Sequence, residues 1–261
     1  MFFAASLLSY ALLATTAFAA NPRLEGRIAR RRDGAHMSGP MRPAVGGVSN
    51  LIKGNTSQVA FSSNWAGAAF ELVYGTFVVP TPKVPSGKST SGTYAASAWV
   101  GIDGDTCGSA ILQTGIDFTI TNGRVSYDAW YEYFPAFATD FTGIPISAGN
   151  TIKLTVTASS TTAGTAVIEN VSTGVTVTKA LTSTAKLCME NAEWIVEDFE
   201  EGSSLVPFAN FGTVTFTGAQ ATTASGSVVG PSGSVLIDLE QGSTVLTSVS
   251  SGTSTVTVTY V

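Results

Sequence analysis

The chain has 261 residues, of which only 12% are charged, against about 25% in an average soluble domain. It holds 13 basic and 18 acidic residues, for a net charge of −5, with two cysteines and one histidine. This balance argues against a basic nucleic-acid surface. The composition lacks the A/E/K/L/R-rich signature of a coiled coil or helical bundle, which argues against both. Two cysteines and one histidine also cannot assemble a Cys/His zinc cluster.

Residues 1–20 have the features of a secretory signal peptide. An apolar stretch ends in Ala17-Phe18-Ala19, the small-x-small pattern of a cleavage site. The apolar run contains Ser and Thr and stops short of about 20 residues, so we do not expect a membrane anchor. The sequence therefore predicts a secreted, extracellular protein.

Residues 21–58 differ in charge from the rest of the chain. They hold seven basic and two acidic residues, together with the single histidine, His36. Such a stretch cannot fold alone, so it is either a disordered linker or, as we favour after a signal peptide, a basic propeptide. Residues 59–261 carry six basic and 16 acidic residues. Attraction between the two parts would form an electrostatic latch that weakens as carboxylates take up protons in acid.

Residues 59–261 are predicted to form a single β domain. Polar and apolar residues alternate along short segments that Gly, Pro, Ser and Asn separate, and no long segment has the apolar stripe of a helix. The expected strands are 68–79, 95–101, 110–120, 125–134, 151–157, 165–170, 175–181, 192–199, 212–217, 234–239 and 255–260. Many short strands without helices predict a sandwich of two antiparallel sheets.

The two cysteines, Cys107 and Cys188, are expected to be structural. In a secreted chain a single disulfide is the usual state of such a pair. The other interpretation, a catalytic thiol, needs a histidine partner, and residues 59–261 contain no histidine.

The lack of histidine in 59–261 restricts the chemistry of this domain. Ser-His-Asp and Cys-His mechanisms are excluded, and so is histidine-ligated catalytic zinc. Carboxylates, amides and tyrosines remain, and they suit hydrolysis with a carboxylate as general acid or base.

Acidic or amide residues recur beside aromatic residues on several expected strands. Alternation groups Trp99 with Asp103; Gln113 with Asp117; Asp128 with Trp130, Glu132 and Phe134; and Glu193 with Glu197. Taken singly, a strand tryptophan is usually core and a strand glutamate is usually solvated. Their recurrence in a chain poor in charge predicts a groove lined by aromatic residues and carboxylates, provided that these strands are neighbours.

Blocks of sequence from about residue 60 onward resemble the glutamic peptidases, or eqolisin family, which are acid endopeptidases secreted mainly by filamentous fungi. The blocks are SNW at 63–65, WVGIDGDTC at 99–107, ILQTG at 111–115, YDAWYE at 127–132, NAEWIVEDFEE at 191–201 and VPFA at 206–209. The resemblance implies a concanavalin-like or jelly-roll-like sandwich of two large antiparallel sheets, with the active-site groove on the concave sheet. It also implies a signal peptide at 1–20, a basic propeptide at 21–58 and a peptidase domain at 59–261.

The resemblance assigns the catalytic roles residue by residue. The catalytic glutamine falls on Gln113, and the catalytic glutamate falls on Glu197 and not on Glu193. Supporting groove positions fall on Trp99, Asp103, Asp117 and Glu132, and the paired cysteines on Cys107 and Cys188. Trp130 is expected to line the substrate groove together with Trp99. Phe134 stands where family members carry tyrosine, which is either tolerated variation or a cause of reduced activity or altered substrate choice.

The implied reaction is hydrolysis of peptide bonds by a water that Glu197 deprotonates and Gln113 holds. It needs no metal and no cofactor. We expect protein and peptide substrates, inhibition by the chain's own propeptide, a monomer, and no binding of nucleic acid or membrane. The alternative is a secreted carbohydrate-binding sandwich, or a glycosidase with Glu132 and Glu197 as its carboxylate pair. A third interpretation is a binding protein that has lost catalysis, for which Phe134 is the sequence hint.

Overall fold

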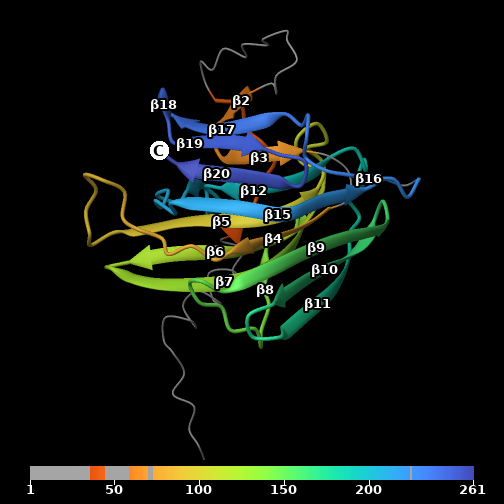
Figure 1. Ribbon diagram of the computed structural model, residues 1–261, viewed down its shortest axis with the longest axis horizontal. Helices are drawn as coiled ribbons and strands as arrows, with labels where there is room; N and C mark the ends of the chain where they lie inside the picture. The colour runs from red at the N-terminus through yellow and green to blue at the C-terminus, as the bar shows by residue number, and fades with distance from the viewer. Residues whose placement is uncertain (1–35, 45–58, 70–72, 224) are drawn as a thin grey trace, which may run out of the picture.

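A computed structural model describes residues 36–44, 59–69, 73–223 and 225–261 of the chain (Figure 1). The expected signal peptide lies outside these residues, and so do 21–35 and 45–58 of the expected propeptide. Throughout the described part the regular structure is β. No helix long and apolar enough to span a bilayer occurs among the described residues.

Two large sheets form the layers of a sandwich, and the model confirms the all-β expectation (Figure 1). The eight-stranded sheet has the order β11-β10-β9-β4-β15-β20-β19, with β16 beside β15. Its strands are β4 (Val73–Val78), β9 (Thr151–Ser160), β10 (Ala163–Asn170), β11 (Val175–Thr182), β15 (Thr213–Thr222), β16 (Val228–Val229), β19 (Thr247–Ser251) and β20 (Thr255–Tyr260).

The nine-stranded sheet has the order β18-β17-β3-β12-β5-β6-β7-β8, with β2 parallel to β17. Its strands are β2 (Val59–Ser62), β3 (Trp65–Ala69), β5 (Thr93–Ile102), β6 (Ile111–Thr121), β7 (Arg124–Phe134), β8 (Thr139–Asp140), β12 (Ala192–Glu197), β17 (Leu236–Gln241) and β18 (Thr244–Val245). A small third sheet joins β1 (His36–Met37), β13 (Glu200–Glu201) and β14 (Ser204–Leu205).

The main core lies between the two large sheets. Alternation sends every second side chain of each strand into this layer. The nine-stranded sheet contributes Ala98, Val100, Leu112, Ile116, Trp194 and Val196, and the eight-stranded sheet contributes Phe77, Ile152, Leu154, Phe216 and Val258. Burying each large side chain stabilises the fold by about 1.5–3 kcal/mol before conformational entropy is counted.

The expectation of one strand over 68–79 is wrong. β3 pairs with β12 and β17 in the nine-stranded sheet, whereas β4 pairs with β9 and β15 in the other. The chain therefore passes from one layer to the other within this stretch. Small and apolar residues run through it, and their pattern alone does not mark the change of sheet.

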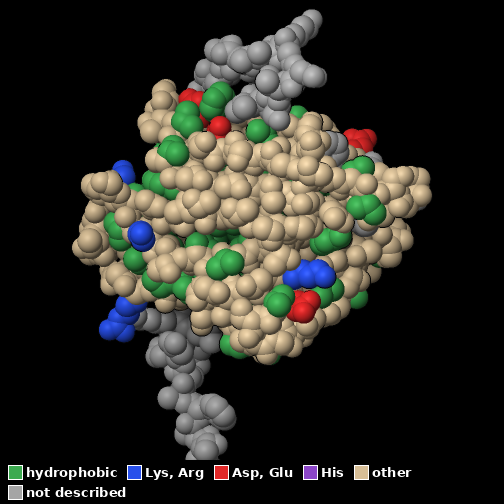
Figure 2. All heavy atoms as spheres, in the orientation of Figure 1, with side chains coloured by type: hydrophobic (Ala, Val, Ile, Leu, Met, Phe, Trp, Pro, Cys, Tyr) green, Lys and Arg blue, Asp and Glu red, His purple; other side chains and the backbone are tan. Residues whose placement is uncertain are grey.

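The outer face of the eight-stranded sheet is rich in hydroxyl groups. Thr213 and Thr259 lie side by side with their hydroxyls 3.2 Å apart, as do Thr215 and Thr257. Few charged side chains are visible over these strands in Figure 2. The unusual polar residues of the chain must therefore be sought on the other sheet.

The expected disulfide between Cys107 and Cys188 is present, with the Cα atoms 6.1 Å apart. It ties the loop after β5 to the loop that precedes β12. Both of these strands contribute to the polar face described next.

Candidate active site

The face of the nine-stranded sheet that points away from the main core collects the expected site residues. Trp99 on β5 lies opposite Gly115 on β6, which lies opposite Trp130 on β7. A methyl group on Gly115 would sit 2.5 Å from the Trp99 Cβ atom and 2.9 Å from the Trp130 ring. Glycine at this position therefore lets two indoles pack across the strand. Two residues before Gly115 on β6, Gln113 lies directly opposite Glu132 on β7.

Glu197 ends β12 and is clasped by two indoles. The Trp65 Nε1 group donates to its Oε1 at 3.2 Å, and the Trp99 Nε1 group donates to its Oε2 at 2.9 Å. Burial raises the pKa of Glu197 to about 8, while the nearby Ser38 hydroxyl and the hydrogen bonds from Trp99 and Trp65 act to lower it. The carboxyl group is therefore held in one orientation, with donors that favour its charged form.

Gln113 presents its carboxamide on the same face of the sheet as Glu197. Its strand, β6, is separated from the strand of Glu197, β12, by β5. Its Nε2 group donates to Glu132 Oε2 at 3.1 Å and to the Ser38 carbonyl at 2.9 Å. Its Oε1 atom is buried and accepts no hydrogen bond from the residues that the structure describes. The side chain thus offers a positioned donor and an open acceptor side by side.

Part of the expected propeptide, 36–44, lies across this face. The Ser38 N–H donates to Glu132 Oε2 at 3.2 Å, and the Trp65 indole donates to the Gly39 carbonyl at 3.1 Å. Within the described structure Gln113 and Glu197 make no direct hydrogen bond to each other. Both instead face the Ser38–Gly39 dipeptide, Gln113 through the Ser38 carbonyl and Glu197 through the Ser38 side chain.

Charged and aromatic contacts hold this segment on both sides of Ser38. His36 Nε2 lies 3.3 Å from Asp117 Oδ2, and the His36 ring packs 4.2 Å from the ring of Phe199, centroid to centroid. The Arg42 guanidinium donates to both carboxylate oxygens of Glu200, at 2.8 and 3.1 Å. Basic residues of the segment thus meet acidic residues of the domain, the arrangement that the charge distribution predicts.

Asp103 lies outside the groove. β5 ends at Ile102, and Asp103 has φ of 67°, so the alternation that grouped it with Trp99 does not reach it. Its carboxylate accepts the N–H groups of residues 189–191 at 2.9, 2.9 and 3.2 Å, which fixes the turn before β12. Burial, followed by the charges of Asp105 and Asp103, raises the pKa of Glu193 well above its usual value.

Ser97 is a site residue that the sequence patterns do not indicate. Its hydroxyl donates to Asp117 Oδ1 at 2.7 Å and accepts the Trp130 Nε1 group at 3.0 Å. It therefore fixes the two side chains that flank His36. A small serine within the Ala-rich strand 95–98 carries no signal of this role.

Phe134 packs at the edge of the apolar cluster on this face, which also contains Trp65, Trp99 and Trp130. Its ring is therefore in place beside the groove, without the hydroxyl that a tyrosine would add there.

Ligand atoms of Asp103, Cys107 and Cys188 lie within 4.8 Å of one another. The two sulfurs are bonded to each other, and the Asp103 carboxylate already accepts three N–H groups. These residues do not fit a metal site, because neither sulfur is available as a thiolate.

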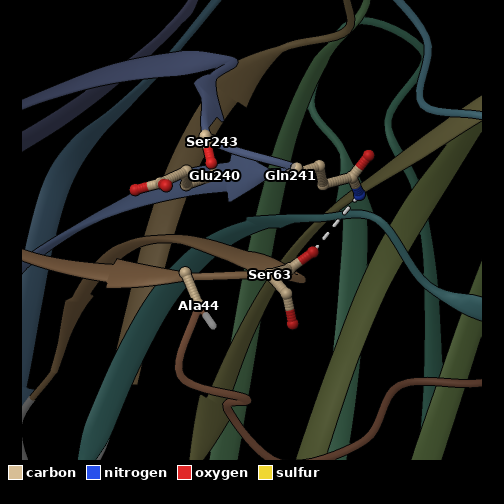
Figure 3. Close-up of a pocket in the computed structure, with 6 residues that line it drawn as sticks. Ala44, Ser63, Glu240, Gln241 and Ser243 are labelled. Atoms are coloured by element: carbon tan, nitrogen blue, oxygen red, sulfur yellow. Dashed lines mark hydrogen bonds between the residues drawn. The ribbon is translucent and has the colours of Figure 1, made fainter. Parts of the chain in front are cut away.

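A separate pocket of about 400 Å³ opens where the segment leaves the groove (Figure 3). It is lined by Ala44, Ser63, Glu240, Gln241, Gly242 and Ser243. Gln241 spans its edge, donating to the Ser63 carbonyl at 3.3 Å and to Asp198 Oδ2 at 2.6 Å.

Comparison with known proteins identifies relatives of the whole domain. Residues 63–260 match the peptidase A4 family. Aspergillopepsin-2 from Aspergillus niger is 47% identical over 282 residues, covering 98% of this chain and 99% of that protein. The crystal structure of scytalido-glutamic peptidase with a transition state analog inhibitor has a TM-score of 0.69 and 42% identity, covering 76% of this chain and 98% of that one. Aspergilloglutamic peptidase from Aspergillus niger has a TM-score of 0.63 and 57% identity, covering 64% and 99% respectively.

Proposed function

This chain belongs to the peptidase A4 (eqolisin) family and is a glutamic peptidase, and from this premise we propose that Glu197 and Gln113 are its catalytic residues. We further propose that it is made as a secreted proenzyme and acts as an endopeptidase in acid. A single observation carries the assignment of the two residues. Both meet the Ser38–Gly39 dipeptide from different strands: Gln113 donates to the Ser38 carbonyl, and the indole of Trp65 that binds Glu197 also donates to the Gly39 carbonyl.

The proposed reaction uses the groups in the places described above. Glu197 as carboxylate takes a proton from a bound water, whose oxygen forms a bond to the scissile carbonyl carbon. Gln113 donates its Nε2 hydrogen to the developing oxyanion, and its open Oε1 orients the water. Protonated Glu197 then gives the proton to the leaving nitrogen as the C–N bond breaks, which restores the carboxylate.

The indole donors suit this double role of Glu197. Trp65 and Trp99 stabilise the carboxylate that must accept the proton, while the apolar surroundings favour the protonated form that must return it. When the segment leaves, water regains access to Glu197, and its pKa is expected to fall from the raised value. The carboxylate then becomes available at lower pH.

Residues 36–44 are proposed to be the inhibitory part of the propeptide. The Ser38 carbonyl accepts from Gln113, as a scissile carbonyl would. The Ser38 hydroxyl faces Glu197 and helps to hold its pKa down, yet it reaches hydrogen-bonding geometry with none of the described residues. In our proposal this hydroxyl stands in the place of the attacking water, so the segment is bound without being cleaved.

The supporting roles of Trp99, Trp130, Asp117 and Glu132 follow from the same contacts. Glu132 fixes the Gln113 amide, and Ser97 links Asp117 to Trp130. Asp103 acts at a distance, through the turn before β12. The glycosidase alternative is less well supported, because Glu132 bonds the Gln113 amide and the relatives are peptidases.

The test is an activity assay on the purified secreted precursor after transfer to acid. We expect cleavage of denatured protein and none of polysaccharide. Mass spectrometry of the same sample should show a new amino terminus between about residue 53 and residue 62. Cleavage of polysaccharide, or no cleavage of protein after the segment has been removed, would overturn the proposal.

A further inference from the structure

We propose that Asn64, supported by Ser62, is a clamp for the main chain of the substrate on the carboxyl side of the scissile bond. The inference rests on the proposed function, because it assumes that a bound substrate follows the path of the segment 36–44. If the Ser38 carbonyl marks the scissile position, Gly39 is the first residue after the bond, Pro40 the second and Arg42 the fourth. Asn64 meets the second and the fourth.

The contacts of the Asn64 carboxamide are those of a two-point main-chain clamp. Its Nδ2 group donates to the Pro40 carbonyl at 3.2 Å, and its Oδ1 atom accepts the Arg42 N–H at 2.9 Å. The Ser62 hydroxyl lies 2.9 Å from both the Arg42 carbonyl and Asn64 Oδ1. One side chain thus bonds a carbonyl and the N–H two residues later, a pattern that fits an extended peptide of any sequence.

The Asn64 side chain is buried, with 2% of its surface exposed, and its polar atoms have little to bond inside the domain. Among the described residues, Nδ2 has one hydrogen-bond acceptor, the Pro40 carbonyl in the segment itself. Removal of the segment would leave this donor without its acceptor. The position therefore favours a peptide that replaces the segment and again offers a carbonyl to this donor.

Main-chain groups of the residues before Asn64 also bind the segment. The Ser63 N–H donates to the Arg42 carbonyl at 2.8 Å, and the Ala44 N–H donates to the Phe61 carbonyl at 3.2 Å. Pro43 and Ser62 form an antiparallel bridge. The segment is therefore added as a short strand beside β2. Beyond Ala44 the pocket at Ser63 and Gln241 leaves room for the peptide to continue (Figure 3).

The clamp predicts that cleavage depends on the main-chain groups of the substrate and on the number of residues after the scissile bond. A substrate needs about four residues after the scissile bond, and the fourth must carry an N–H group. The fifth position needs none, since Pro43 occupies it in the segment. The test therefore compares three fluorogenic peptides with one cleavable bond and six residues after it: an unmodified peptide, one N-methylated at the fourth residue, and one N-methylated at the fifth. A fourth peptide is truncated after the first residue, so it lacks both groups that Asn64 is proposed to bind.

For the mature enzyme we expect kcat/KM to fall about 10-fold on N-methylation of the fourth residue or on truncation, and by less than about twofold on N-methylation of the fifth. Asn64→Ala should cleave the truncated peptide nearly as well as the wild type does and lose the advantage of the long one. Thr244→Ala is the control. It removes an exposed hydroxyl from strand β18 of the same sheet, outside the contacts described between the segment and the domain, so the advantage should remain.

Equal cleavage of the long and truncated peptides by wild-type enzyme would overturn the clamp and leave the proposed peptidase intact. Equal loss on both peptides in a folded Asn64→Ala variant would also overturn it, because that pattern indicates a purely structural role. If Asn64→Ala fails to fold, the N-methylated peptides on wild-type enzyme decide the matter alone. No cleavage of any peptide would instead overturn the proposed function, and the clamp with it.

Discussion

The two faces of the nine-stranded sheet are both buried, but they are built for different purposes. Toward the eight-stranded sheet, Leu112 and Val196 pack into a continuous apolar core. Toward the segment 36–44, the neighbouring residues Gln113 and Glu197 present an amide and a carboxyl group. A single step along the strand therefore separates residues that hold the fold from residues that we propose carry the reaction.

The difference shows how this domain accommodates buried polar groups. On the core face burial is favourable in itself, whereas on the polar face each group needs a partner or must lose its charge. Indole and amide donors supply some partners, and the segment supplies others. Carboxyl groups that lack enough partners have raised pKa values, and they are neutral in acid.

The largest effect that separates the two faces is expected from adjacent residues of β6. Gln113→Ala removes the proposed oxyanion donor, so acid proteolysis should fall about 10²–10³-fold with little change in melting temperature. Leu112→Ala creates a cavity in the core and should lower the free energy of unfolding by about 2–5 kcal/mol. It should retain activity at temperatures where it stays folded. Loss of stability without loss of activity in Gln113→Ala would erase the distinction.

A smaller effect is expected in the pH dependence of stability. Burial raises the pKa of Asp198 from 3.8 to about 8, although a hydrogen bond from Gln241 lowers it. Between these values the folded chain holds a proton that the unfolded chain has lost. The contribution of Asp198 to the free energy of unfolding is therefore fully present below about pH 4, and it declines as the pH rises toward 8.

The measurement is the free energy of unfolding at several pH values for the mature chain and for Asp198→Asn. The substitution should remove up to about 1.4 kcal/mol per pH unit from the slope. Ser203→Ala, at an exposed residue without an ionisable group, is the control and should leave the slope unchanged. An unaltered slope in Asp198→Asn would show that Asp198 is already ionised in the folded chain.

The smallest effect concerns the segment 36–44, which lies over the polar face. Arg42 pairs with Glu200, but 51% of its side chain is exposed, so the ion pair contributes only about 0.2–1 kcal/mol. Arg42→Ala should therefore speed activation of the precursor in acid by no more than about fivefold at low salt. Added salt should shrink the difference between wild type and variant. A salt-independent difference would mean that Arg42 acts through packing and not through charge.

Local sequence patterns predict much of the fold, because alternation sets which residues share a face. The β6 sequence puts Gln113 on the face opposite Leu112, and this is what the structure has. Alternation ends with the strand, however, so it misplaces Asp103, which follows Ile102 in a left-handed turn. The switch of sheets between β3 and β4 was also missed, because strand partners are distant in sequence.

The candidate site was only partly predictable, for a related reason. The family resemblance identifies Gln113 and Glu197 as candidate catalytic residues, because the sequence blocks around them are long and specific. Asn64 lies in one of those blocks, but its role depends on a segment more than 20 residues away. Ser97 likewise acts through contacts with β6 and β7. Charge balance predicts that 21–58 is attracted to the domain, and it cannot say where the segment binds.

The most direct test compares two glutamates on one strand. Glu193 and Glu197 are both fully buried on β12, but in the described structure only Glu197 accepts two indole N–H groups. Mature Glu197→Gln and Glu193→Gln chains are assayed on denatured protein at acid pH. The account predicts a loss of about 10³-fold or more for Glu197→Gln and activity within a few-fold of wild type for Glu193→Gln. Near-normal activity of Glu197→Gln would contradict it.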